Sequence, residues 1–151
     1  MFDFKRKLGS DDITEKIFPA DVSALNDVLA FIERQLEKAN YPIKTVTRIC
    51  VAIEEVFVNV AHYAYKDGKG DAKIAFGFDK SSHTATFVLP DSGVPLDPLQ
   101  KSESDITLSA DERKIGGLGI FITKKTMDNV SYRYENGENI LTMTKKYKRS
   151  L

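Results

Sequence analysis

Two stretches in the first half of the chain place apolar residues at helical spacing. In the first, apolar residues recur every three or four positions: Val22, Leu25, Val28, Leu29, Ile32, Leu36 and Ala39. This period predicts a helix with one buried side, which begins after Asp21 as its N-cap and ends at Asn40-Tyr41-Pro42. The second stretch, residues 48–65, is apolar on nearly every side, which is typical of a buried helix.

Alternation with a period of two predicts strands in the rest of the chain. We expect strands in this order: residues 2–8, 13–18, 72–79, 84–89, 130–135 and 139–147. The strands over residues 72–79 and 84–89 would form an antiparallel hairpin that turns at residues 80–82. The last two strands flank Asn136-Gly137, a dipeptide that is a strong signal for a type I′ turn.

Between the two hairpins, residues 92–113 show no period and contain Gly93, Pro95 and Pro98. A loop of this length in a compact domain is often a functional lid. A helix opened by glycines follows over residues 116–128. The order β-α-α-β-β-loop-α-β-β predicts an α+β fold, a two-layer sandwich in which a mixed, mostly antiparallel sheet carries helices on one face.

The size and charge of the chain limit its function classes. Its 151 residues are the length of one domain with a real core. Lys plus Arg and Asp plus Glu both number 22, and this zero net charge argues against direct nucleic-acid binding. No apolar run approaches the ~20 residues of a membrane span, no secretory h-region opens the chain, and Cys50 is the only cysteine. We therefore expect one domain over residues 1–151, in the cytoplasm and without membrane contact.

Glu55 and Asn59 are the polar exceptions in the second helical stretch. They stand four residues apart, about one helical turn, so both side chains leave the helix on the same face. Burying polar groups without partners costs several kcal/mol, roughly. A bound metal with a phosphate would supply partners, whereas the alternative is a polar stripe that reaches solvent.

A second candidate site is the segment Asp91-Ser92-Gly93-Val94-Pro95, at the end of a predicted strand. A carboxylate there can accept hydrogen bonds from an exocyclic amine. Glycine would let a ligand approach the backbone closely. The alternative is an ordinary Asp-Ser-Gly turn.

A third candidate is the glycine-rich segment 116–120, Gly-Gly-Leu-Gly-Ile, which opens a predicted helix. Backbone N–H groups at a helix N-terminus favour anions, and Arg113 and Lys114 lie just before it. The alternative is a flexible linker. A dinucleotide fingerprint fits poorly because Ile122 holds the third glycine position, and the P-loop pattern is absent.

Taken in order, the patterns E-x-x-x-N, D-x-G-x-P and G-G-L-G-I resemble the GHKL (Bergerat) ATP-binding fold. The finer resemblance is to the single-domain bacterial anti-sigma-factor serine/threonine protein kinases. It rests on EEVFVNVAHYAY, DSGVPLDP, ITLSADERKIGGLGIFITKKTMDNVSY and NGENILTMTKKY. The similarity runs over nearly the whole chain from the first predicted helix onward.

The resemblance implies a role for each candidate residue. Asn59 would hold Mg²⁺ that bridges the ATP phosphates, and Glu55 would be the general base for an attacking serine hydroxyl. Asp91 would receive the adenine amino group, with Gly93 beneath the base. The phosphates would be bound by Lys114, Gly117, Leu118 and Gly119, under a lid formed by residues 92–114. Ile115 departs from the family, because some of these kinases place an arginine at this position.

The function that the resemblance implies is an ATP- and Mg²⁺-dependent serine/threonine protein kinase of the anti-sigma regulatory type. Its substrate would be a serine on a STAS-domain anti-anti-sigma protein, with a sigma factor as a further target, and the family suggests a homodimer. One alternative is a nucleotide-gated protein-binding switch module with little or no phosphotransfer. Another, a histidine-kinase catalytic fragment, is disfavoured because no upstream helix carries a phospho-acceptor histidine.

Overall fold

The computed structural model of the protein describes residues 13–65, 69–95, 97 and 117–147. The predicted strand over residues 2–8 and most of the predicted lid lie outside the described residues. The elements in chain order are β1 (Ile13–Pro19), the 3-10 helix η1 (Val22–Ala24), α2 (Leu25–Lys38), α3 (Ile43–Tyr63), β2 (Asp71–Asp79), β3 (Thr84–Asp91), α4 (Gly117–Thr126), β4 (Asn129–Glu135) and β5 (Glu138–Lys146).

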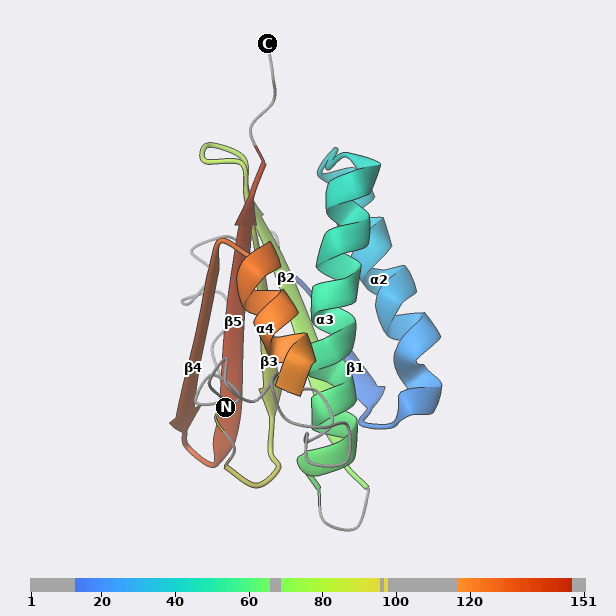
Figure 1. Cartoon of the computed structure of the whole chain (residues 1–151), viewed down its shortest axis with the longest axis vertical. Coiled ribbons are helices and arrows are strands. Elements are labelled where there is room, and N and C mark those ends of the chain that lie inside the picture. The colour runs from blue at the N-terminus through green and yellow to red at the C-terminus, as the bar shows by residue number, and fades with distance from the viewer. Residues whose placement is uncertain (1–12, 66–68, 96, 98–116, 148–151) are drawn as a thin grey trace.

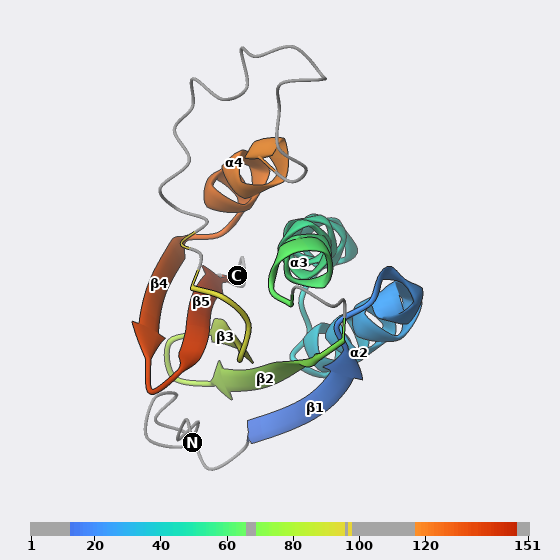
Figure 2. The same ribbon diagram turned by 90° about the horizontal axis from the view of Figure 1, so that it is seen from below.

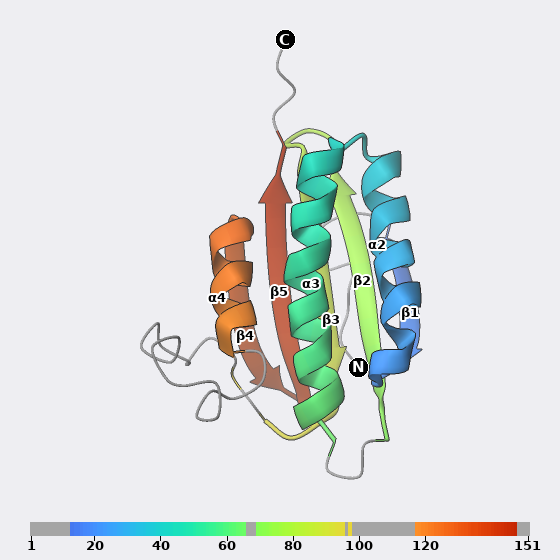
Figure 3. The ribbon, with the colours of Figure 1, turned by 45° about the vertical axis from the view of Figure 1, so that its right-hand side comes forward.

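The strands form one sheet with the order β1-β2-β3-β5-β4, and every described pair is antiparallel (Figure 1). The sheet curves around the helices, which all lie on its one side (Figure 2). Viewed across that side, α3 runs between α2 and α4 (Figure 3). The predicted α+β two-layer architecture with helices on one face is therefore confirmed.

The hydrophobic core fills the space between the sheet and the helices. From the sheet, Phe87 of β3 and Met143 of β5 have no exposed surface. From the helices, Ile32 of α2 and the pair Ile53 and Phe57 of α3 are equally buried. Complete burial of each such side chain stabilises the fold by about 1.5–3 kcal/mol. The core thus fixes α3 against the central strand.

The helix predicted over residues 48–65 begins earlier, at Ile43, and ends at Tyr63. Pro42 is its N-cap residue, at a helix start where no backbone N–H is needed. The prediction that this helix is buried on nearly every side is wrong for its outward face, where Val51 is 40% exposed. The sheet lies behind α3 and two helices flank it, so no described element covers that face (Figure 3). None of the described helices is long and apolar enough to cross a membrane.

The predicted N-cap at Asp21 and the predicted type I′ turn at Asn136-Gly137 are both confirmed. The carboxylate of Asp21 accepts a hydrogen bond from the Ser23 N–H at 3.2 Å, although the helix it caps is the short η1 that precedes α2. Asn136 and Gly137 both have positive φ angles, 52° and 79°, as a type I′ turn requires. Cys50 is buried. The pKa of its thiol is raised to about 11, mainly by burial and further by the negative charges of Glu33 and Glu54.

Helix α4 is held against α3 by a buried hydroxyl. Thr123 has no exposed surface, and its Oγ1 donates a hydrogen bond to the carbonyl oxygen of Ala52 at 3.0 Å. This bond crosses from one helix to the other in the interior. The bond therefore joins the second half of α4 to α3.

We expect Thr123→Val to lower the free energy of unfolding by about 1 kcal/mol, the net worth of a typical hydrogen bond. Valine keeps the shape of the side chain and removes only the donor. Thr47→Val is the matched control, because Thr47 forms the same kind of bond to a helix carbonyl, that of Ile43 at 3.0 Å, on the exposed surface. Urea unfolding of the two variants measures the difference, and equal midpoints would contradict the role of the buried bond.

Candidate functional site

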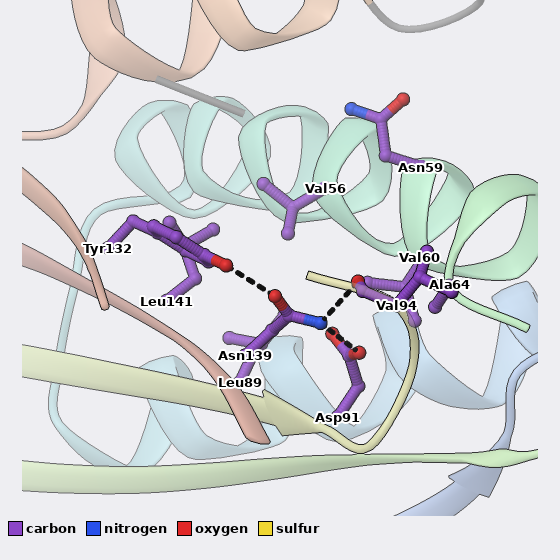
Figure 4. A pocket seen from close by; sticks show the side chains of 10 residues that line it. All are labelled: Val56, Asn59, Val60, Ala64, Leu89, Asp91, Val94, Tyr132, Asn139 and Leu141. Atoms are coloured by element: carbon purple, nitrogen blue, oxygen red, sulfur yellow. Dashed lines mark hydrogen bonds between the residues drawn. The ribbon is translucent and has the colours of Figure 1, made fainter. Parts of the chain in front are cut away.

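A pocket lies between the second half of α3, the end of β3, the middle of β4 and the start of β5. Its empty space is about 480 Å³ when the open mouth is included. Figure 4 shows the lining residues: Val56, Asn59, Val60, Ala64, Leu89, Asp91, Val94, Tyr132, Asn139 and Leu141. The walls are mostly apolar, and the polar groups are few and grouped.

Asp91 reaches the pocket because it is the last residue of β3, opposite Asn139 of β5 in the sheet register. Neighbouring residues in register present their side chains on the same face of a sheet. The Asp91 carboxylate accepts two hydrogen bonds at one oxygen, Oδ1, from the Gly93 N–H at 2.9 Å and from Asn139 Nδ2 at 2.9 Å. Within the described residues, Oδ2 accepts none. This oxygen is available to a ligand that donates a hydrogen bond.

Burial shapes the charge of this carboxylate. Asp91 is 8% exposed. Burial raises the pKa of its carboxyl above the usual range, the bonds from Asn139 and Gly93 oppose the rise, and the charge of Glu138 adds to it. The two donors therefore favour the ionised form, whereas burial disfavours it.

Asn139 and Tyr132 complete the polar end of the pocket, and the sequence analysis missed both. The Tyr132 hydroxyl donates to Asn139 Oδ1, and Asn139 Nδ2 also donates to the carbonyl oxygen of Val94 at 2.9 Å (Figure 4). Asparagine is depleted in strands. The asparagine that precedes the apolar residues 140–141 in a predicted strand was therefore the sequence signal that could have identified Asn139 as a site residue. The amide of Asn139 links a tyrosine on β4 to the carboxylate on β3.

Asn59 lies at the other edge of the pocket, and its side chain points away from Asp91 and Asn139 (Figure 4). Its Oδ1 is buried and has no hydrogen-bond partner in the described part of the chain. An amide oxygen without a donor fits a hard cation such as Mg²⁺, which prefers oxygen ligands and shares them with substrate phosphates. No cluster of three or more His, Cys, Asp or Glu side chains able to hold a metal occurs among the described residues.

Glu55 stands one turn before Asn59 on α3, as predicted, but it does not line the pocket. Its side chain is half-buried. Among the residues that the structure describes, no hydrogen bond or ion pair reaches its carboxylate. The structure therefore places Asn59 and Asp91 around one pocket and Glu55 beside it.

Gly93 is required by a close approach of two backbone segments. A Cβ atom at this position would lie 2.1 Å from the carbonyl oxygen of Ala64, at the end of α3. The next residue, Val94, donates its N–H to the same oxygen at 2.7 Å. Glycine thus lets the chain after β3 pack on α3, and the contact with a base stays a prediction.

The predicted phosphate-binding residues are described less fully. Lys114 lies outside the described residues. Gly117, Leu118 and Gly119 form the first turn of α4, so the prediction that glycines open this helix is confirmed. Their contact with phosphate stays a prediction.

We expect Asp91→Asn to raise the free energy of unfolding at pH 7. The amide Oδ1 can still accept from Gly93 and Asn139, while the buried charge is removed. Because the folded pKa of Asp91 is raised, wild-type stability falls as pH rises from the unfolded value, 3.8, through the folded one. The advantage of the variant should therefore shrink as the pH is lowered towards 4. Urea unfolding across this range measures it, and a variant less stable than wild type at pH 7 would contradict the cost assigned to the charge.

Comparison with known proteins identifies the family of this chain. Residues 18–145 match the family described as the histidine kinase-like ATPase domain. Serine-protein kinase RsbW of Listeria monocytogenes is 25% identical over 112 residues, 72% of this chain and 70% of the relative. The protein of the same name from Bacillus pumilus is 24% identical over 139 residues, 89% of this chain and 85% of the relative.

Solved structures share the fold. The RsbU and RsbW domains of Rv1364c from Mycobacterium tuberculosis align with a TM-score of 0.65 at 15% identity, covering 91% of this chain and 33% of that one. This chain thus spans about a third of the length of that solved chain. The SiaB-SiaC complex from Pseudomonas aeruginosa aligns with a TM-score of 0.57 at 12% identity, covering 95% and 98%. The chain belongs to the histidine kinase-like ATPase family, the GHKL fold that its three motifs resemble.

Proposed function

We propose that this protein is an ATP- and Mg²⁺-dependent serine/threonine protein kinase of the anti-sigma regulatory type. The observation that carries the proposal is a pair of oxygens on one pocket that accept no hydrogen bond from the described residues. Within that part of the chain, Asp91 Oδ2 has no donor at one end of the pocket, and Asn59 Oδ1 is buried without a partner at the other. Glu55 stands one helical turn from Asn59.

The adenine base would occupy the end of the pocket near Asp91. The exocyclic amine of adenine donates the hydrogen bond that Oδ2 can accept, and a guanine presents an acceptor there instead. The side chains of Val56, Leu89 and Leu141 form apolar walls for the base. ATP would therefore be selected over GTP by one carboxylate oxygen.

The phosphates would extend from the base towards Asn59 and the start of α4. Asn59 Oδ1 would hold Mg²⁺, which supplies positive charge to the phosphate oxygens when it is bound. The backbone N–H groups at Gly117, Leu118 and Gly119 would bind phosphate at the helix N-terminus, with Lys114 beside them. Residues 92–114 would close over the nucleotide as the lid.

In the transfer step, Glu55 would accept the proton of the substrate serine hydroxyl. The serine oxygen then forms a bond to the γ-phosphorus, the bond from that phosphorus to the β,γ-bridging oxygen breaks, and ADP leaves. Catalysis of this kind rests on positioning and electrostatics. A half-buried carboxylate with no partner in the described structure suits a base that waits for an external hydroxyl.

The proposed substrate is a serine on a STAS-domain anti-anti-sigma protein, in the cytoplasm. The relatives of this chain carry the name serine-protein kinase, and one neighbour, SiaB, is solved in complex with a second protein, SiaC. The proposal also includes a sigma factor, which this protein would bind alternately with the STAS protein. It further includes a homodimer of this chain.

One observation favours a second function, a nucleotide-gated protein-binding switch with little or no phosphotransfer. Glu55 lies outside the pocket lining, and no described residue orients its carboxylate. In this case the same pocket would change the affinity for a partner only through nucleotide binding.

Nucleotide selectivity tests the base-binding end. We expect Asp91→Asn to weaken ATP binding by about 10-fold or more, since an amide donor would face the adenine amine and a hydrogen bond to a charged group contributes about 1.5–3 kcal/mol. GTP binding should change less, so the preference for ATP should fall. Titration calorimetry with both nucleotides measures this. Unchanged ATP affinity in the folded variant would remove Asp91 from the site.

Substitutions of Asn59 and Glu55 should have different effects on ATP binding and phosphotransfer. Asn59→Ala should weaken Mg²⁺-dependent ATP binding itself, because it removes the proposed metal ligand. Glu55→Gln should bind ATP nearly normally while phosphotransfer falls by about 10²–10⁴, the usual contribution of a general base. The measurement is single-turnover transfer of labelled γ-phosphate to a STAS-domain protein, with ATP affinity determined on the same preparation.

Glu54→Gln is the matched control, because Glu54 precedes Glu55 on α3 and is also half-buried. It should transfer phosphate at the wild-type rate. If Glu55→Gln does the same, Glu55 is not the base. If wild type binds ATP and transfers phosphate to no STAS partner, the switch module is the better account.

A further inference from the structure

The hydroxyl of Tyr65 stands between the ends of two neighbouring strands. It donates a hydrogen bond to the carbonyl oxygen of Asp71 at 2.6 Å and accepts one from the N–H of Ser92 at 3.1 Å. In the register of β2 with β3, Ala72 lies opposite Asp91, so Asp71 and Ser92 are the next facing residues. The hydroxyl therefore occupies the place where a direct ladder bond between these two residues would form.

The ring of Tyr65 is fixed in this position by Gly70. A Cβ atom on Gly70 would lie 2.3 Å from the ring, so only glycine lets the backbone pack so closely. Gly70 is itself held, because its carbonyl oxygen accepts the N–H of Ala20 at 2.9 Å. The hydroxyl thus stands on a rigid support.

The consequence is a change of direction after β3. Three successive N–H groups leave the sheet ladder: that of Ser92 donates to the Tyr65 hydroxyl, that of Gly93 to Asp91 Oδ1, and that of Val94 to the Ala64 carbonyl oxygen. Two of the three acceptors belong to consecutive residues at the end of α3. The turn that orients the Asp91 carboxylate is therefore attached to the helix that carries Asn59.

The chain uses the same arrangement at the opposite end of β3. The Tyr41 hydroxyl accepts the N–H of Ala85 at 3.0 Å and donates to the carbonyl oxygen of Lys145 at 2.6 Å. Ala85 and Lys145 face each other in the register of β3 with β5. Tyr41 is thus a chemically matched residue, and it does not line the pocket.

We propose that Tyr65 is a positioning residue for nucleobase recognition, whose hydroxyl keeps the ends of β2 and β3 apart so that Asp91 presents Oδ2 to the base. This inference rests on the proposed ATP binding. Without the hydroxyl, the Asp71 carbonyl oxygen and the Ser92 N–H lose the partner that links them. Ser92 is then no longer held at this position, and the adjoining Asp91 carboxylate shifts with it.

The test compares Tyr65→Phe with Tyr41→Phe in the full chain, by titration with Mg²⁺–ATP and Mg²⁺–GTP. Tyr65→Phe should weaken ATP binding by about 3- to 10-fold, the worth of about one hydrogen bond, with GTP binding nearly unchanged. The ratio of the two affinities should therefore fall. Tyr41→Phe should lower stability and keep the wild-type ratio. Gly70→Ala, which displaces the Tyr65 ring, should reproduce the lower ratio.

The outcomes separate this inference from the proposed function. A wild-type protein that prefers ATP, together with a Tyr65→Phe variant that keeps the preference, overturns the role of Tyr65 alone. An equal loss in the Tyr41→Phe variant, or a Tyr65→Phe protein that does not fold, also overturns it, because both show a structural role. A wild-type protein that binds neither nucleotide overturns the proposed function and this inference with it.

Discussion

A buried carboxylate at the end of the central strand is the constraint on which the pocket depends. Two N–H donors converge there on one oxygen of Asp91 and favour its ionised form. One donor exists because the antiparallel register sets Asn139 opposite Asp91, and the other because the chain turns back at Gly93. The hydrogen bonds offset burial only in part, since the pKa of the carboxyl remains raised.

The polar end of the pocket is consequently a series of linked hydrogen bonds that all donate towards Asp91 or the Val94 carbonyl oxygen. The hydroxyl of Tyr132 donates to Asn139, and the amide of Asn139 donates to Asp91 and to the Val94 carbonyl. Each link sets the orientation of the next, and in a low-dielectric interior such bonds strengthen one another. The Asn139 amide cannot rotate without exchanging donors for acceptors at Asp91 and Val94.

The fold could be predicted from the sequence because the spacing of apolar residues and the residues that form caps and turns depend only on neighbouring positions in the chain. The 3.6-residue period of α2, the Asp21 cap and the Asn136-Gly137 turn each follow from neighbouring residues. The outward face of α3 could not be predicted in this way, because burial depends on which other elements pack against a helix. Its start at Ile43 was missed because Pro42 in the sequence indicates only the end of the preceding helix, whereas that helix ends at Lys38 and Pro42 is the N-cap of α3.

The candidate site was predicted where a motif lay in one short segment, and missed where it depended on strand pairing. Asp91 and Asn59 belong to such segments, and the structure brings both to the pocket. Asn139 and Tyr132 join them only through the register of β5 with β3 and β4. Tyr65 lies inside a segment used for the resemblance, but its role depends on the ends of β2 and β3.

Helix α3 gives the pocket a fixed scale. Asn59 and Ala64 lie on one continuous stretch of helical backbone, five residues apart, which corresponds to about 7.5 Å along the axis. Ala64 anchors the turn that carries Asp91, so both ends of the pocket are set from the same rigid rod. In the proposed complex, the distance between the adenine base and the metal-bound phosphate would therefore be set by α3 before the nucleotide binds. In the proposed kinase, structural changes that follow transfer of the terminal phosphate would fall on parts of the chain that α3 does not hold.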